Sequence, residues 1–254
     1  MSITIKSRTD LNRMREAGRV AARALQIAGQ SLEPGMTTLD VDKIVHDYIV
    51  RQGAYPSFLN YGGFPGSACV SVNDVVIHGI PSAHYKLKSG DIVSIDVGAK
   101  LNGFHGDTCA TFPVGKISKE AQALLDVTKA SLYEGIARAV TGARLSDVSA
   151  AVEQYCRSRG YGIVREYCGH GIGRELHESP EVPNYVDSRS RDQRVKLMAG
   201  MCICIELMIN VRGDEVRRAK DGWTVRTKSG SLSAHFEHAI AVTPDGPVIL
   251  TDPE

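Results

Sequence analysis

LKSGDIVSID (residues 87–96) and LMAGMCICIE (197–206) are two versions of one segment. In both, a leucine precedes a glycine by three positions, and an isoleucine followed by an acid closes the segment, with Asp96 in the first and Glu206 in the second. The first alternates apolar and polar residues and the second is apolar almost throughout, and both patterns are typical of β-strands. A strand that carries a carboxylate therefore occurs twice in this chain.

The repeat extends beyond these strands. Shifting the sequence by 107 positions, from 35 to 142, matches helix with helix, and six identities support the match: Gly35/Gly142, Asp40/Asp147, Val41/Val148, Val45/Val152, Tyr48/Tyr155 and Gly53/Gly160. His78-Gly79-Ile80 likewise matches His170-Gly171-Ile172. The shared order predicts two pseudo-symmetric halves, at about 9–113 and 118–243, whose carboxylates face one central site.

Helical spacing over Thr9–Gln30 predicts a first helix, and Thr37 or Thr38 caps a second that ends before Gly53. Residues 54–67 are rich in glycine, proline and tyrosine and indicate an irregular loop, as does the charged run 187–196. No linker divides the chain. We therefore expect one α+β domain over 1–254, with helices backing a curved antiparallel sheet.

Composition excludes several classes of function. The chain has 254 residues, 43% of them hydrophobic, and a formal charge of +1, which gives no reason to expect nucleic acid or an acidic membrane surface as a partner. A core of this size needs no metal for stability, so any metal would serve chemistry. The charged N-terminus, Met1–Asp10, lacks the apolar core of an export signal, and we expect a cytoplasmic protein. Six scattered cysteines are expected to be reduced and mostly buried.

A predicted hairpin brings two acids together. Residues 91–97 form one strand, Asn102-Gly103 is a strong turn signal, and residues 103–112 return as the next strand. A two-residue loop pairs position 96 with 109, so Asp107 lies on the same face as Asp96 and about 7 Å away diagonally. Such a pair needs a compensating cation if it is buried, whereas a solvent-facing pair would need none.

Glu206 and Glu237 each stand within an apolar, strand-like run, where an unpartnered carboxylate is costly. His170 lies between glycines, and although a single histidine is more often structural, imidazole is a common ligand of transition metals. Four acids and a histidine form a donor set of the kind that holds two divalent ions.

These residues lie in motifs that are highly specific in combination: HGIP (78–81), SIDVG (94–98), HGDT (105–108), GHGIG (169–173) and SLSAHFEH (231–238). Almost end to end, the chain resembles type I methionine aminopeptidases of the bacterial, extension-free kind, which have the pita-bread fold. The resemblance implies that Asp96 binds one metal, that Asp107 and Glu237 bridge both, and that His170 and Glu206 complete the other.

The resemblance also implies catalytic roles for His78, His177 and Glu206, with both histidines contacting substrate. Four residues would line the methionine side-chain pocket, although composition alone would assign them to the core: Tyr61, Phe64, Cys69 and Trp223. Three more would form a monovalent-cation site: Asn73, Val75 and Ser233.

Five positions depart from the pattern of this family. Leu207 replaces a proline beside Glu206, and His235 replaces a glutamine, which is expected to add a titratable group and shift the pH optimum. Leu176, Phe58 and Gly66 are atypical around the pocket and are expected to change its shape.

The activity implied is removal of N-terminal methionine from nascent proteins and peptides with a small second residue, by a monomer that meets its substrates at the ribosome. The cofactors would be two divalent ions, drawn from manganese, iron(II), cobalt and zinc. One alternative is a proline-specific exopeptidase of the same fold, although such enzymes generally have an additional N-terminal domain. The other alternative is a non-catalytic binding module with the pita-bread fold. Such a protein would be expected to have lost some of the metal-ligating residues.

Overall fold

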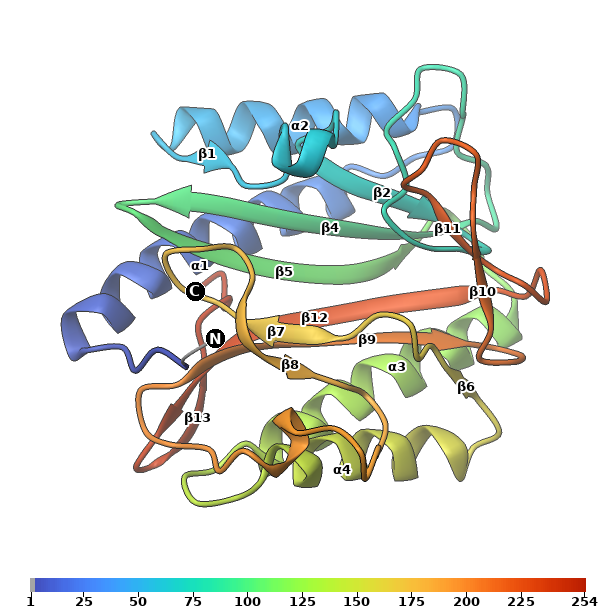
Figure 1. Cartoon of the computed structure of the whole chain (residues 1–254). Helices are drawn as coiled ribbons and strands as arrows, with labels where there is room; N and C mark the ends of the chain where they lie inside the picture. Colours follow the sequence, from blue (N-terminus) through green and yellow to red (C-terminus); the bar gives the residue numbers. More distant parts are fainter. Residues whose placement is uncertain (1–2) are drawn as a thin grey trace.

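The computed structural model describes residues 3–254. Met1 and Ser2 lie outside the described residues, and they belong to the N-terminal segment, Met1–Asp10, for which no export signal is expected. Four helices and thirteen strands make up the described chain (Figure 1). The helices are α1 (Arg8–Gln30), α2 (Thr38–Arg51), α3 (Lys119–Arg138) and α4 (Leu145–Arg157). The strands are β1 (Tyr55–Pro56), β2 (Ala68–Val72), β3 (Val75–Ile77), β4 (Ile92–Leu101), β5 (Phe104–Pro113), β6 (Gly162–Ile163), β7 (Gly169–Gly171), β8 (Glu178–Val182), β9 (Cys202–Asn210), β10 (Val216–Arg218), β11 (Val225–Thr227), β12 (Ser233–Thr243) and β13 (Gly246–Ile249).

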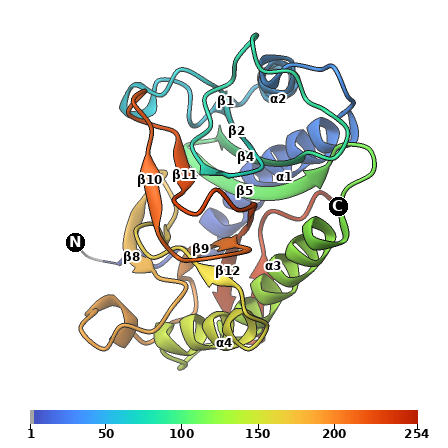
Figure 2. The ribbon, with the colours of Figure 1, turned by 90° about the vertical axis from the view of Figure 1, so that its right-hand side faces the viewer.

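One large antiparallel sheet organises the molecule, with strand order β1-β4-β5-β12-β9-β7-β8. The four helices cover one side of it, while β10, β11 and β3 form a small sheet near the other side (Figure 2). Apolar side chains of α1 and α2 pack against β2 and β4, and those of α3 and α4 pack against β9 and β12. This arrangement confirms the predicted α+β class, with helices backing a curved antiparallel sheet.

Equivalent hydrogen bonds show the pseudo-symmetry of the two halves. The Gly35 N–H donates to the Leu87 carbonyl at 2.8 Å, and the Gly142 N–H donates to the Leu197 carbonyl at the same distance. Both glycines have a positive φ, which a residue with a Cβ rarely adopts. The chain therefore enters α2 and α4 in the same way, and each helix is tied to the segment that leads into a carboxylate-bearing strand.

The hairpin of β4 and β5 has the predicted register. Leu101 pairs with Phe104, and Asp96 pairs with Cys109. Asn102 and Gly103 both have positive φ, at 51° and 80°, as a two-residue type I′ turn requires. The turn therefore sets the register that puts Asp96 and Asp107 on one face.

The loops contain more structure than expected. Residues 54–67 include β1, which pairs with the end of β4, and a short 3-10 helix at Tyr61–Gly63. The charged run 187–196 includes a second 3-10 helix, Asp192–Arg194, in which Gln193 is buried. All six cysteines are free, and five of them are buried. Among the described helices, none has the length and apolarity needed to cross a membrane.

Gly106 on β5 sets the distance between α1 and the sheet. A Cβ at this position would overlap the backbone nitrogen and Cα of Gly18 on α1. We expect Gly106→Ala to lower the free energy of unfolding by about 1–3 kcal/mol, because neither backbone can move without disturbing the packing. Urea denaturation measures the change, and unaltered stability would show that α1 shifts outward at no cost.

Candidate active site

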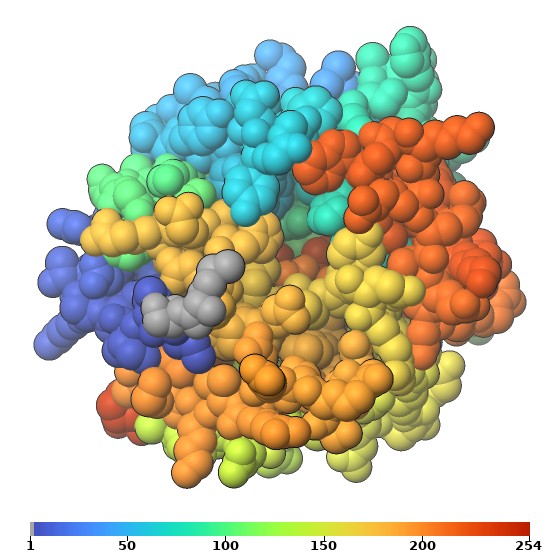
Figure 3. Space-filling model, viewed as in Figure 1, coloured from blue at the N-terminus to red at the C-terminus, as the bar shows by residue number. Residues whose placement is uncertain are grey.

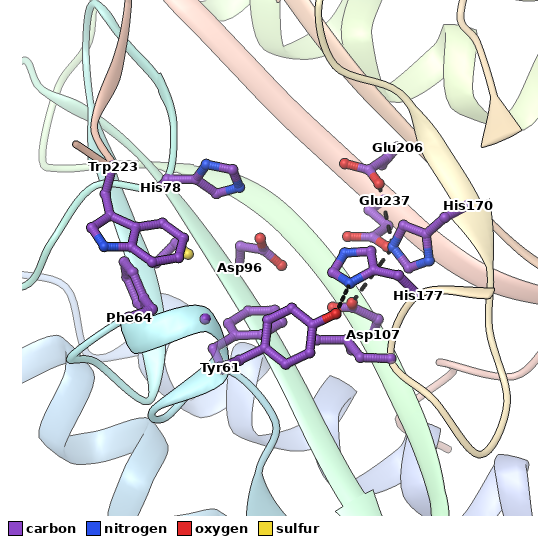
Figure 4. A pocket seen from close by; sticks show the side chains of 14 residues that line it. Tyr61, Phe64, His78, Asp96, Asp107, His170, His177, Glu206, Trp223 and Glu237 are labelled. Atoms are coloured by element: carbon purple, nitrogen blue, oxygen red, sulfur yellow. Dashed lines mark hydrogen bonds and ion pairs between the residues drawn. The ribbon is translucent and has the colours of Figure 1, made fainter. Parts of the chain in front are cut away.

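Four acids meet in the middle of the large sheet, and Asp107 and Glu237 are buried while Asp96 and Glu206 are partly buried (Figure 4). Asp96 on β4 pairs with Cys109 on β5, Cys109 pairs with Glu237 on β12, and Glu237 pairs with Glu206 on β9. Three of the acids thus lie in one row across the sheet. Asp107 is two residues from Cys109 and therefore projects from the same face.

His170 on β7 completes the cluster. Its Nε2 lies 3.5 Å from Oε1 of Glu206 and 4.0 Å from Oδ2 of Asp107. Its Nδ1 lies 2.9 Å from the Gly171 carbonyl, which can only accept, so Nδ1 carries the proton and the lone pair of Nε2 faces the acids. Burial lowers the pKa of His170 to about 3, which keeps the ring neutral and able to bind a metal.

The four acids repel one another without a cation. Burial raises the pKa of Asp96 to about 7. It also raises the pKa values of Asp107, Glu206 and Glu237 well above their usual range, and the neighbouring carboxylates raise them further. Oδ1 of Asp96, Oδ1 of Asp107 and Oε1 of Glu237 are buried and have no hydrogen-bond partner. Hard oxygen donors with free lone pairs, beside a neutral imidazole, fit divalent metal ions.

An apolar cavity leads to these acids. Its volume is about 210 Å³, and it lies beneath a hollow between the loop around Tyr61–Gly63, the chain before β7 and the β10–β11 segment (Figure 3). All four residues expected to line the pocket do so: Tyr61, Phe64, Cys69 and Trp223. Phe64 and Trp223 contact edge to face, with ring centroids 5.2 Å apart. Aromatic walls beside a polar end are typical of a small-ligand site.

His177 stands beside the cluster of acids and His170. Its Nδ1 lies 2.8 Å from the Tyr61 hydroxyl, and its ring centroid lies 4.2 Å from that of His170. Burial lowers the pKa of His177. When Tyr61 donates its proton to Nδ1, the proton of His177 is on Nε2, where it can be donated to a ligand.

His78 lies on another side of the same cavity (Figure 4). It has a φ of 57°, which is uncommon for a residue with a Cβ and is often found at functional sites. Its ring contacts the rings of Tyr167 and Trp223 edge to face, and burial lowers its pKa to about 4. The structure thus brings both sequence-predicted histidines to the cavity as neutral rings.

Comparison with known proteins agrees with this geometry. The model of metallopeptidase family M24 matches residues 12–244. Methionine aminopeptidase of Clostridium acetobutylicum is 48% identical over 250 residues, covering 98% of either chain, and that of Escherichia coli is 46% identical, covering 99% of this chain and 94% of the other. The crystal structure of methionine aminopeptidase from Rickettsia prowazekii superposes with a TM-score of 0.95 at 40% identity, covering 99% of this chain and 100% of the other.

The chain belongs to the methionine aminopeptidases of family M24. Membership implies a metal-dependent hydrolase that binds divalent ions, and the cluster of acids has the donors for them. Prolidase from Pyrococcus furiosus has a TM-score of 0.76 at 20% identity, and this chain covers 66% of it. That likeness shows a common fold only.

Two departures from the family pattern lie beside Glu206. Nε2 of His235 is buried, has no hydrogen-bond partner and lies 3.7 Å from Oε2 of Glu206. Burial lowers the pKa of His235 to about 3, so this ring is neutral near neutral pH, and an effect of His235 on the pH optimum stays a prediction. Leu207 packs in the core between the sheet and α3 and α4, so its side chain points away from the acids.

The three remaining departures differ in their effect on the pocket. Phe58 and Leu176 line it and pack with Phe64, Cys69 and Trp223 in one apolar cluster. Gly66 lies outside the lining and sits against Pro81 and the Ala68 carbonyl, where a Cβ would have no room. Gly66 therefore affects how the loop packs rather than the wall of the pocket.

The residues expected to hold a monovalent cation also meet. The Ser233 N–H donates to the Asn73 carbonyl at 2.9 Å, and Val75 follows on β3. The Asn73 side chain donates to Asp91 at 2.8 Å and accepts from the Ile92 N–H at 3.1 Å. A cation at this point stays a prediction.

Cys204 is the group at the centre that sequence reasoning missed. One donor atom each of Asp107, His170, Cys204 and Glu237 lies within 4.8 Å of the others. From the sequence alone, this cysteine is expected in the core with the others. Its position two residues before Glu206, on the same face of a predicted strand, is the signal that identifies it.

Proposed function

We propose that the protein removes the N-terminal methionine from proteins and peptides whose second residue is small. The observation that carries this is an apolar cavity that ends on the metal-ligand cluster, defined as the four acids and His170, with His78 and His177 on its walls. The volume suits one side chain, and aromatic walls favour a thioether. Binding of the substrate's free α-amine by a metal would confine cleavage to the first peptide bond.

Two divalent ions would be held by the five ligands. We propose that Asp96 binds one of them, that Asp107 and Glu237 bind both, and that His170 and Glu206 complete the other. Such ions lower the pKa of water and polarise a carbonyl group. Manganese, iron(II), cobalt and zinc all suit carboxylate and imidazole donors, and their availability decides among them.

The protein's own groups would carry the remaining steps. His177 donates from Nε2 to the oxygen of the scissile carbonyl as negative charge develops there, and the Tyr61 hydroxyl holds the ring in that tautomer. Glu206 takes the proton of the attacking water and passes it to the leaving amine. His78 contacts the peptide nitrogen from the other side of the cavity.

Every newly made chain begins with methionine, so we propose nascent chains as substrates, met at the ribosome in the cytoplasm by a monomer. The two alternatives have less support. The ligands and both histidines are all present, which does not favour a non-catalytic binding module. The prolidases match only in fold, which does not favour proline-specific cleavage.

Release of free methionine from Met-Ala-Ser tests the proposal. The metal-stripped protein is supplemented in turn with manganese, iron(II), cobalt and zinc, and Met-Leu-Ser and Ala-Pro-Ala are run beside it. We expect metal-dependent release from Met-Ala-Ser and little from the others. Preferential cleavage of Ala-Pro-Ala would identify a proline-specific enzyme, and no cleavage of any peptide by folded protein would identify a binding module.

A further inference from the structure

The thiol of Cys204 lies at the edge of the metal-ligand cluster. Cys204 is on β9, has no exposed surface and pairs with Ala239 on β12. It is two residues from Glu206 and projects from the same face of the sheet. Its sulfur belongs to the group of four donor atoms that all lie within 4.8 Å of one another.

The partners of this sulfur have free capacity to share an ion. Oδ1 of Asp107 and Oε1 of Glu237 are buried and unpartnered, and these residues are only 3% and 2% exposed. The lone pair of His170 Nε2 faces the same space. Zinc accepts all three kinds of donor in this group, carboxylate oxygen, imidazole nitrogen and thiolate sulfur, and Glu206 adds a further oxygen to the same ion.

The rest of the surroundings of Cys204 is apolar. It packs in a cluster with Met14, Phe104 and Ile172. A metal ion at this position favours the thiolate.

We propose that Cys204 is an additional, sulfur donor to the ion that contacts Asp107, His170 and Glu237, and that it biases the centre toward thiophilic metals. The inference rests on the metal centre in the proposed function. When the ion binds, the S–H bond breaks heterolytically, its electron pair forms the bond to the metal, and the proton leaves to water. The oxidation states of sulfur and metal do not change.

Cobalt(II) absorption tests for the sulfur bond directly. Metal-free protein is titrated with cobalt(II), and we expect a near-ultraviolet sulfur-to-cobalt charge-transfer band in the wild type that Cys204→Ser and Cys204→Ala both lose. Cys202→Ser is the matched control, because Cys202 lies on the same strand and face, is buried in the same apolar cluster and is outside the group of four donors. Absence of the band in the wild type, or its persistence in both Cys204 variants, would overturn the proposal.

Metal affinities show whether Cys204 binds the ion itself or only lies beside residues that do. We expect Cys204→Ser to weaken cadmium(II) binding by at least about 10-fold and to leave manganese(II) affinity within about 3-fold, because a thiolate selects soft metals. An equal loss for both metals would show that Cys204 acts only through its neighbours, and no loss for either would remove it from the centre. Asp107→Asn is measured beside them: if it leaves binding of both metals unchanged, the proposed centre itself is wrong, whatever Cys204 does.

Discussion

Asp107→Asn is expected to give a folded protein that is inactive and, when both proteins are metal-free, more stable than the wild type. The substitution keeps the shape of the side chain and removes one of four crowded acids. Activity should fall by more than about 100-fold, the upper loss found when only outer-shell partners of a metal are removed. The unfolding free energy of the metal-free protein should rise by at least about 1 kcal/mol, because the substitution removes carboxylate repulsion that corresponds to a pKa shift of roughly one unit.

Thermal unfolding with and without added manganese(II) or cobalt(II) measures the second effect. Metal should raise the Tm of the wild type and have little effect on Asp107→Asn, whose metal-free Tm should be higher by about 2–4 °C. Asp245→Asn is the control, because Asp245 is exposed in the turn between β12 and β13 and does not line the cavity. If the Tm of metal-free Asp107→Asn is lower than that of the metal-free wild type, the Asp107 carboxylate stabilises the fold and the prediction is wrong.

The meeting of the four acids was predictable because strands obey simple geometry. A period of two and one turn signal place Asp96 and Asp107 on one face, and the structure has that register. Glu206 and Glu237 were conspicuous because acids are rare within apolar strands. The internal repeat predicted that the carboxylates of the two halves face one central site. In the sheet, the equivalent strands β4 and β9 lie on either side of the central pair β5 and β12.

The parts of the site that lie on loops could not be found in this way. His177 lies in the chain between β7 and β8, and its position depends on contacts with Tyr61, which is 116 residues away in sequence. β1 forms only because the end of β4 offers it an edge, which no local pattern indicates. Resemblance to a family supplied His177, whereas Cys204 was passed over because a buried cysteine ordinarily packs as a small apolar residue.

His177→Ala is expected to lower kcat by about 100- to 1000-fold with little change in KM. In the proposed mechanism, Nε2 of His177 donates to charge that develops in the transition state and is absent from the bound substrate. Steady-state kinetics on Met-Ala-Ser over a range of substrate concentrations separates the two constants. A rise in KM with unchanged kcat would instead make His177 a residue that only holds the substrate.

Tyr61→Phe tests whether the hydroxyl works through that histidine. The variant keeps the aromatic ring in the pocket wall and removes the donor 2.8 Å from His177 Nδ1, and we expect a loss in kcat of about 10-fold. In the His177→Ala background the same change should have no further effect, because residues that act through one another are not additive. Tyr85→Phe, at an exposed tyrosine outside the cavity, is the control. A Tyr61→Phe loss of the same size in both backgrounds would mean that the hydroxyl contacts the substrate itself.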